Sequence, residues 1–217
     1  MNLWSLRPIA ESTNSKNKML NPAQRGAKRA FDLVFSLLGI ILAGWVMLIA
    51  WIIASLVTKS NGLFKQERVG REGKLFWVFK IKTMRQVMGV DTTVTTSGDR
   101  RITRSGAFFR KSKIDELPQF FNVLFGSMSF VGPRPDVVGF ADRLEGEDRL
   151  VLSVRPGITG PASLKYRNEE EILAQQNDPQ QYNREVFWPD KVKINLDYVK
   201  HWSFAKDIGY ILKTFKG

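Results

Sequence analysis

Apolar positions in the first quarter of the chain form one long block rather than an alternating pattern. The block runs from Leu33 to Val57 and contains no charged side chain. As a helix it would reach about 37 Å at 1.5 Å per residue, enough to cross a hydrocarbon layer about 30 Å thick. The block is long for a helix buried in a soluble core, and the polar lead before it is too long for a signal peptide. The pattern therefore predicts a membrane-embedded helix over residues 25–59, preceded by a mobile polar tail over residues 1–24.

Basic residues flank both ends of this block, within residues 25–29 and again within residues 59–74. The positive-inside rule places such residues on the cytoplasmic side of a membrane. A helix that enters and leaves by the same face satisfies the rule at both ends, whereas a straight span leaves one cluster outside. We expect the re-entrant form, with Gly39 and Gly44 as candidate break points, and keep a straight span as the alternative.

Beyond residue 60 the pattern changes to short elements. The segment KLFWVFKIK is rich in β-formers and follows the turn sequence VGREGK, which predicts a small hairpin. Lys80 shares one face of this strand with Phe76 and Val78, so its ammonium group either extends to the surface or meets a buried anion. Residues 86–106 are polar and rich in Thr and Gly, which is typical of a lid or binding loop.

The end of the chain predicts amphipathic helices. Apolar residues recur at near-helical spacing after Trp188, among several lysines and Trp202. Such helices either lie in a membrane interface or pack on the domain core. The fold class predicted from the whole pattern is α+β and mostly helical. It comprises the membrane-embedded helix and a compact cytoplasmic domain over residues 60–217, with a small β-hairpin and interfacial amphipathic helices.

Charge and composition narrow the chemistry. The net charge of +12 is carried entirely by the first half of the chain, which indicates an anionic partner such as nucleic acid, an acidic membrane surface or phosphates. The chain has no cysteine and a single histidine, His201. Disulfides, zinc–thiolate sites, cysteine nucleophiles and histidine-based triads are therefore excluded within one chain.

Two adjacent carboxylates, Asp115 and Glu116, stand just before Pro118 in the sequence DELPQFFNVLF. Pro118 suits the first turn of a helix, so both carboxylates are expected near a helix N-terminus, where the helix dipole keeps Asp115 ionised. They either cap this helix or handle an anionic substrate, one attacking and the other holding a metal. A carboxylate can act as a covalent nucleophile without histidine, provided that cations offset the charge of a phosphate. Arg110 and Arg134 are candidates for that role.

These residues carry a resemblance to a known family. The chain resembles the bacterial sugar transferases, the monotopic polyprenol-phosphate phosphoglycosyl transferases, over about residues 22–217. The similarity rests on KRAFD before the apolar block, FKQERVGREGKLFWVFKIKTMR, RPGITGPASLKYR, and above all DELPQ followed by GSMSFVGPRP. In that family a Ser-Pro pair usually breaks the membrane helix, and Gly44–Trp45 stands at the corresponding position here.

The resemblance implies an activity and a set of roles. Family members transfer a sugar 1-phosphate from a UDP-sugar to undecaprenyl phosphate and release UMP, the first step of a polysaccharide or glycoconjugate. By resemblance, Asp115 is the nucleophile, Glu116 the Mg²⁺ ligand, and Lys80, Arg110 and Arg134 contact phosphates. The expected location is the bacterial inner membrane, with the catalytic domain on its cytoplasmic face and membrane lipids as partners.

Two other readings of the sequence are possible. A membrane-tethered basic domain that binds nucleic acid would also fit the charged first half with its interleaved aromatic residues, although lipid headgroups explain much of that charge. An inactive scaffold could retain the fold, but the intact Asp115 and Glu116 speak against it. We therefore expect an enzyme with no nucleic-acid partner.

Overall fold

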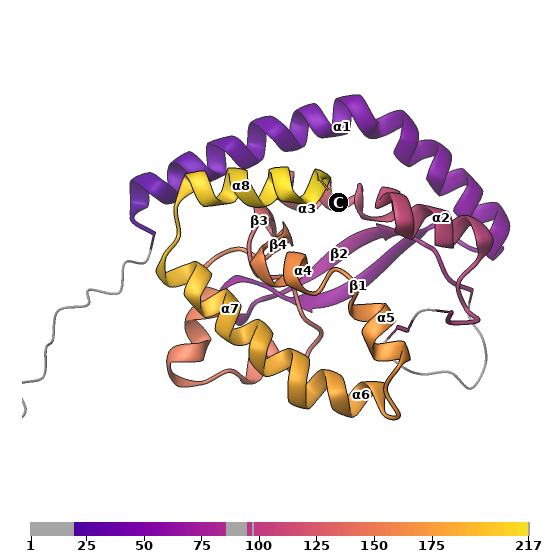
Figure 1. The fold of residues 1–217 in the computed structure, drawn as a ribbon. Coiled ribbons are helices and arrows are strands. Elements are labelled where there is room, and N and C mark those ends of the chain that lie inside the picture. Colours follow the sequence, from indigo (N-terminus) through magenta and orange to yellow (C-terminus); the bar gives the residue numbers. More distant parts are fainter. Residues whose placement is uncertain (1–19, 86–94, 97, 217) are drawn as a thin grey trace, which may run out of the picture.

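The computed structural model describes residues 20–85, 95–96 and 98–216, a mostly helical α+β arrangement beneath one long helix (Figure 1). Most of the predicted tail falls outside these ranges, and its last three residues belong to the long helix. Much of the loop predicted at 86–106 is also outside them, so its role as a lid stays a prediction.

Helix α1 (Pro22–Thr58) is continuous through the two glycines expected to break it. It begins at a capping box, in which the side chain of Asn21 accepts from the backbone of Gln24 and the Gln24 side chain accepts from the backbone of Asn21. It ends at Lys59, whose backbone is left-handed. The helix arches over the domain with its convex side outward (Figure 1), the curvature expected when only one side of a helix is packed. The predicted break is therefore wrong, because neither glycine interrupts the hydrogen bonding of the helix.

Both ends of α1 pack on the same domain. Near its start, Phe31 meets Phe204 of α8 (Phe204–Phe215) with ring centroids 5.4 Å apart. Near its end, Ala50 and Ala54 share a buried cluster with Ile81 and with residues of the next helix along the chain. The same domain therefore contacts α1 near both of its ends.

The polar residues at the start of α1 serve the protein interior. Lys28 forms a buried ion pair with Asp207 of α8. Arg29 donates to the carbonyl oxygens of Val123 and Leu124 at 2.6 and 2.7 Å. The carboxylate of Asp32 is buried and accepts from a serine hydroxyl and a backbone N–H of the strand at 129–131. Lys28 and Arg29, two of the basic residues that flank the apolar block, therefore bind groups of the domain.

The predicted hairpin is confirmed. Strands β1 (Leu63–Val69) and β2 (Leu75–Ile81) pair antiparallel, with Phe64 opposite Lys80, and the turn at 70–74 contains the short helix η1 (Arg71–Gly73). A second sheet was not anticipated: β3 (Ser129–Val131) pairs in parallel with β4 (Gly157–Thr159).

Short helices surround these strands and complete the domain. Asp178 caps the helix that starts at Pro179, because its side chain accepts from two backbone N–H groups of that helix. The remaining elements are α2 (Arg104–Ser112), η2 (Ile114–Glu116), α3 (Gln119–Phe125), η3 (Ala141–Arg143), η4 (Gly146–Ser153), α4 (Pro161–Lys165), α5 (Glu169–Ala174), α6 (Pro179–Tyr182), η5 (Asn183–Phe187) and α7 (Trp188–Lys200).

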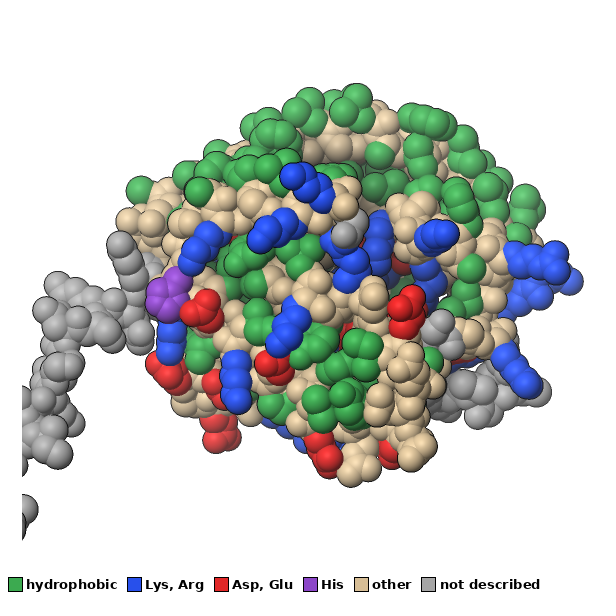
Figure 2. Space-filling view, in the orientation of Figure 1, with side chains coloured by type: hydrophobic (Ala, Val, Ile, Leu, Met, Phe, Trp, Pro, Cys, Tyr) green, Lys and Arg blue, Asp and Glu red, His purple; other side chains and the backbone are tan. Residues whose placement is uncertain are grey.

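The two C-terminal helices pack differently. In α7, Val192, Tyr198 and Val199 are buried in the core, so this helix belongs to the domain interior. Helix α8 lies beside α1 and leaves Leu212 and Phe215 exposed. Figure 2 shows apolar side chains covering the outer face of α1, with Lys and Arg side chains below it. The largest exposures on that face are those of Ile41, Leu42, Trp45 and Leu56.

Candidate active site

The two adjacent carboxylates lie in a tight turn between two helices. Helix α2 ends at Lys113, whose left-handed backbone (φ 58°) reverses the chain and starts η2. Ile114 packs against the buried cluster beneath α1, which turns Asp115 inward. No side-chain capping bond is made at the start of α3, so of the two alternatives left open by the sequence the structure does not show helix capping.

Glu116 is held between two cations. Its Oε1 accepts from Lys80 Nζ at 3.1 Å and from Arg134 Nη2 at 2.7 Å. Burial acts to raise the pKa of the Glu116 carboxyl, but Arg134 and Lys80 overcome it and hold that pKa far below its usual range. Of the two alternatives for Lys80, the structure shows the contact with a buried anion, and that anion is Glu116.

Asp115 is adjacent to Glu116 in the sequence but has a different environment. Its side chain is buried, and Oδ1 has no hydrogen-bond partner among the described residues. Burial, followed by the Glu116 charge, raises the pKa of Asp115 to about 6, against the opposing effect of Lys80, Arg110 and Lys113. The helix-dipole explanation for an ionised Asp115 is therefore wrong, although a pKa of about 6 still leaves roughly nine in ten of these carboxyls ionised at pH 7.

Helix α3 fixes this turn against strand β2. Asn122 accepts from the backbone N–H of Phe79 at 3.0 Å and donates to the carbonyl oxygen of Trp77 at 2.6 Å. These bonds engage backbone groups of β2 on its free edge, away from β1. They tie the helix that follows Glu116 to the strand that carries Lys80, which fixes the Lys80–Glu116 pair.

The loop after β3 presents Arg134 from the other side. Gly132 lies so close to the next segment that an added Cβ would be 2.5 Å from the carbonyl oxygen of Arg155. Pro133 accepts from Gly157 at 2.8 Å, and the backbone of Asp136 accepts from Val69 at 2.9 Å. The loop is thus fastened both to β4 and to the end of β1, so Arg134 projects from a rigid support.

Arg110 is the predicted phosphate contact that the structure does not bring into the Glu116 cluster. Its guanidinium forms an ion pair with Glu170 of α5 instead. It still lies near enough to lower the pKa of Asp115. The structure therefore unites Asp115, Glu116, Lys80 and Arg134, with Arg110 at the edge of the group.

A further group of charged residues near Arg134 escaped the sequence analysis. Arg68 donates to the carbonyl oxygen of Pro135 at 3.2 Å, and Lys191 pairs with Glu169 at 2.6 Å. Both cations act on the carboxyl of Asp136, which immediately follows the PRP sequence. That adjacency to Arg134 was the one sequence signal that could have found Asp136.

The residues present fit a magnesium ion that arrives with a phosphate-bearing substrate. Mg²⁺ is usually bound by one or two carboxylates together with substrate phosphates. Asp115 offers a buried carboxylate oxygen without a partner, and Glu116 is an ionised carboxylate beside it. No group of three or more His, Asp or Glu side chains suited to a metal occurs within the described ranges, so substrate oxygens would complete the ligand set.

Comparisons with known proteins identify relatives of the chain. The family model described as bacterial sugar transferase matches residues 23–217. The chain is 36% identical over 206 residues to the UDP-glucose:undecaprenyl-phosphate glucose-1-phosphate transferase of Escherichia coli K12, covering 91% of this chain and 41% of that protein. It is 32% identical over 219 residues to the undecaprenyl-phosphate galactose phosphotransferase of Salmonella typhimurium LT2, covering 93% and 42%.

A third relative carries another sugar in its name. The UDP-N-acetylgalactosamine-undecaprenyl-phosphate N-acetylgalactosaminephosphotransferase of Aeromonas hydrophila is 32% identical over 202 residues, covering 90% of this chain and 44% of that protein. The chain thus spans about two fifths of the length of the curated relatives it matches.

Proposed function

The chain belongs to the bacterial sugar transferase family, and from this premise we propose that it transfers a sugar 1-phosphate from a UDP-sugar to undecaprenyl phosphate, releasing UMP. One observation carries the proposal. A buried Asp115 with an unpartnered oxygen lies beside Glu116, which Lys80 and Arg134 hold in place. This is a nucleophile next to preorganised positive charge, which transfer of a charged phosphoryl group requires.

The proposed reaction has two displacements at one phosphorus atom. The carboxylate of Asp115 attacks the sugar-linked phosphorus of the UDP-sugar, the bond to the bridging oxygen breaks, and UMP leaves with that oxygen. A phosphoglycosyl-aspartate remains. The phosphate of undecaprenyl phosphate then attacks the same phosphorus and the Asp115 carboxylate leaves, giving undecaprenyl diphosphate-sugar. The partially desolvated setting of Asp115 favours the first step, because its attacking oxygen has no protein hydrogen bond to break.

The cations around the site offset the charge that accumulates on the phosphates. Arg134 projects from its fixed loop beside Asp115 and can bind phosphate oxygens through two N–H groups at once. Lys80 adds a second positive charge from β2. A bound Mg²⁺, held by Glu116 with the Asp115 oxygen nearby, would neutralise substrate phosphate charge further.

We also propose that α1 inserts into the cytoplasmic face of the bacterial inner membrane from one side. Its packed side touches the domain along most of its length, whereas its outer side exposes a continuous apolar surface that membrane lipids would cover. The chain has no native cysteine, so single cysteines at Gln24 and Ser60 test this directly. Membrane-impermeant reagents should label both from the cytoplasmic side, and labelling from opposite sides would refute a one-sided insertion.

The activity is tested by UMP release in the presence of undecaprenyl phosphate and a panel containing UDP-glucose, UDP-galactose and UDP-N-acetylgalactosamine. At least one donor should support turnover. Asp115→Asn should abolish it, while Asp148→Asn, the same chemical change at an exposed carboxylate, should retain it. Full turnover by Asp115→Asn would end the nucleophile assignment.

A further inference from the structure

We infer that Asp136, which lies near Arg134, binds a pair of neighbouring hydroxyl groups of the nucleotide-sugar donor. The inference rests on the proposed function and goes beyond it, since it assigns a binding residue outside the phosphate-handling group. Asp136 is then a specificity-determining residue for the donor.

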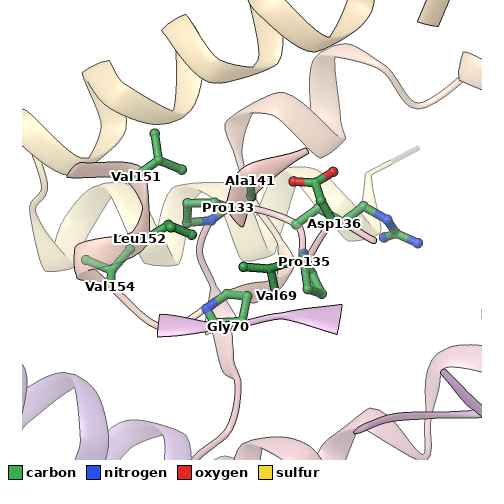
Figure 3. Close-up of a pocket in the computed structure, with 11 residues that line it drawn as sticks. Val69, Gly70, Pro133, Pro135, Asp136, Ala141, Val151, Leu152 and Val154 are labelled. Atoms are coloured by element: carbon green, nitrogen blue, oxygen red, sulfur yellow. The ribbon is translucent and has the colours of Figure 1, made fainter. Parts of the chain in front are cut away.

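The position of Asp136 is fixed by the chain on both sides of it. Its backbone accepts from Val69 at the end of β1, and the carbonyl of the preceding Pro135 accepts from Arg68. Together with Arg134 it lines a small, otherwise mainly apolar pocket of about 20 Å³ between the end of β1 and the segment at 151–156, and Figure 3 shows its carboxylate at one end of that pocket. The pocket and the Glu116 site therefore share one residue, Arg134.

The carboxylate of Asp136 has no hydrogen-bond or ion-pair partner within the described ranges, although three cations act on it. Each of those cations is bound elsewhere: Lys191 to Glu169, Arg134 to Glu116, and Arg68 to Gln66 and a backbone carbonyl. Burial raises the pKa of Asp136 to about 6, the sign of an acceptor that the protein itself does not satisfy. Because Asp136 is only half-buried, water reaches its carboxylate, and hydroxyl groups of a ligand can take the place of that water.

The chemistry of the donor identifies that ligand. A carboxylate repels phosphate but accepts two parallel hydrogen bonds from adjacent hydroxyl groups. A UDP-sugar holds such pairs on both sides of its diphosphate, in the ribose and in most hexoses. With the diphosphate beside Arg134 and Asp115, one of these rings is the part of the donor that comes next to Asp136. Both rings offer a vicinal diol to Asp136, and the experiment distinguishes the ribose from the hexose.

Calorimetric titration of the full chain in the presence of Mg²⁺ tests the inference, with UDP, 2′-deoxy-UDP, UDP-glucose and inorganic pyrophosphate as probes. Asp136→Asn should weaken UDP-glucose binding about tenfold or more, because a hydrogen-bond acceptor for hydroxyl groups is lost. It should leave pyrophosphate binding unchanged or slightly tighter, since a negative charge is removed. Asp148→Asn, the matched change at an exposed carboxylate, should behave like the unmodified chain.

The probes divide the outcomes. If the ribose is bound, UDP weakens together with UDP-glucose, and 2′-deoxy-UDP binds the unmodified chain as weakly as UDP binds the variant. If the hexose is bound, only UDP-glucose weakens. Equal binding of all probes by Asp136→Asn and the unmodified chain would overturn the inference, as would a loss that extends to pyrophosphate. If the unmodified chain bound no nucleotide sugar, the proposed function itself would fail, a result that does not depend on the variant.

Discussion

The buried ion pair between Lys28 and Asp207 should be the strongest single attachment of α1 to the domain. The two side chains are only 11% and 4% exposed. Asp207 also accepts from Tyr198 Oη at 2.8 Å and from Trp202 Nε1 at 3.0 Å. Changing Asp207 to Asn keeps the size and an acceptor oxygen but leaves the Lys28 charge buried without its counter-ion. Removing one member of a buried pair typically costs about 3 to 5 kcal/mol of unfolding free energy.

For a domain of this size that loss corresponds to a decrease in Tm of roughly 6 to 20 °C. The assay is thermal and denaturant-induced unfolding in detergent micelles, followed by tryptophan fluorescence. The matched control is Glu147→Gln, which breaks the ion pair between Glu147 and Lys200. Because the Glu147 side chain is 59% exposed, this change should lower the free energy of unfolding by less than about 1 kcal/mol. Adding Lys28→Met to Asp207→Asn should recover most of the loss, because the uncompensated charge is removed while the acceptor oxygen for the neighbouring donors is kept. If Asp207→Asn were no more destabilising than Glu147→Gln, the assignment of α1 to a firmly docked position would be refuted.

Three further predictions concern packing, pH and metal. Gly39→Leu should weaken the docking of α1, because a Cβ there would lie 2.6 Å from the Phe120 ring, whereas Gly44→Leu, with no neighbour within 4 Å, should not lower Tm; equal Tm values would contradict the packing. Because the folded-state pKa of Asp136 is raised to about 6, its stabilising contribution is present below pH 4 and is lost as the pH rises through 6. Between pH 4.5 and pH 7.5 the free energy of unfolding of Asp136→Asn should therefore rise by about 1 to 2 kcal/mol relative to that of the unmodified chain, after allowance for solvent screening. A difference between the two that did not change with pH would argue against the raised pKa of Asp136. EDTA should stop UMP release and Mg²⁺ should restore it, with Glu116→Gln needing at least about tenfold more Mg²⁺; turnover without metal would remove that role from Glu116.

The local pattern was sufficient for the elements whose signals are continuous in sequence. The apolar block predicted α1, and the β-rich segment with its turn predicted the hairpin that carries Lys80. The parallel pair of β3 and β4 escaped because each strand has three residues and its partner is distant in sequence. Strands this short leave no periodicity to detect.

Charged residues were harder to interpret because their partners are distant in the chain. The sequence showed Lys28 only as one of the basic residues that flank the apolar block, because its partner Asp207 is 179 residues away. Asp136 was overlooked for a related reason: its surroundings exist only once the loop after β3 meets β1 and α7. By contrast, Asp115 and Glu116 were found from sequence because the two residues are adjacent. Their opposite pKa shifts could not be found, since these depend on burial and on Arg134.

The central claim is that Asp115 carries the sugar phosphate covalently between the two displacements. It is tested most directly by incubating the chain with a UDP-sugar and Mg²⁺ in the absence of lipid acceptor, quenching with acid, and analysing its peptides by mass spectrometry. The peptide containing Asp115 should carry the mass of one glycosyl phosphate, and this mass should disappear when undecaprenyl phosphate is added before the quench. An unmodified Asp115 under conditions in which UMP is released would rule out the covalent intermediate.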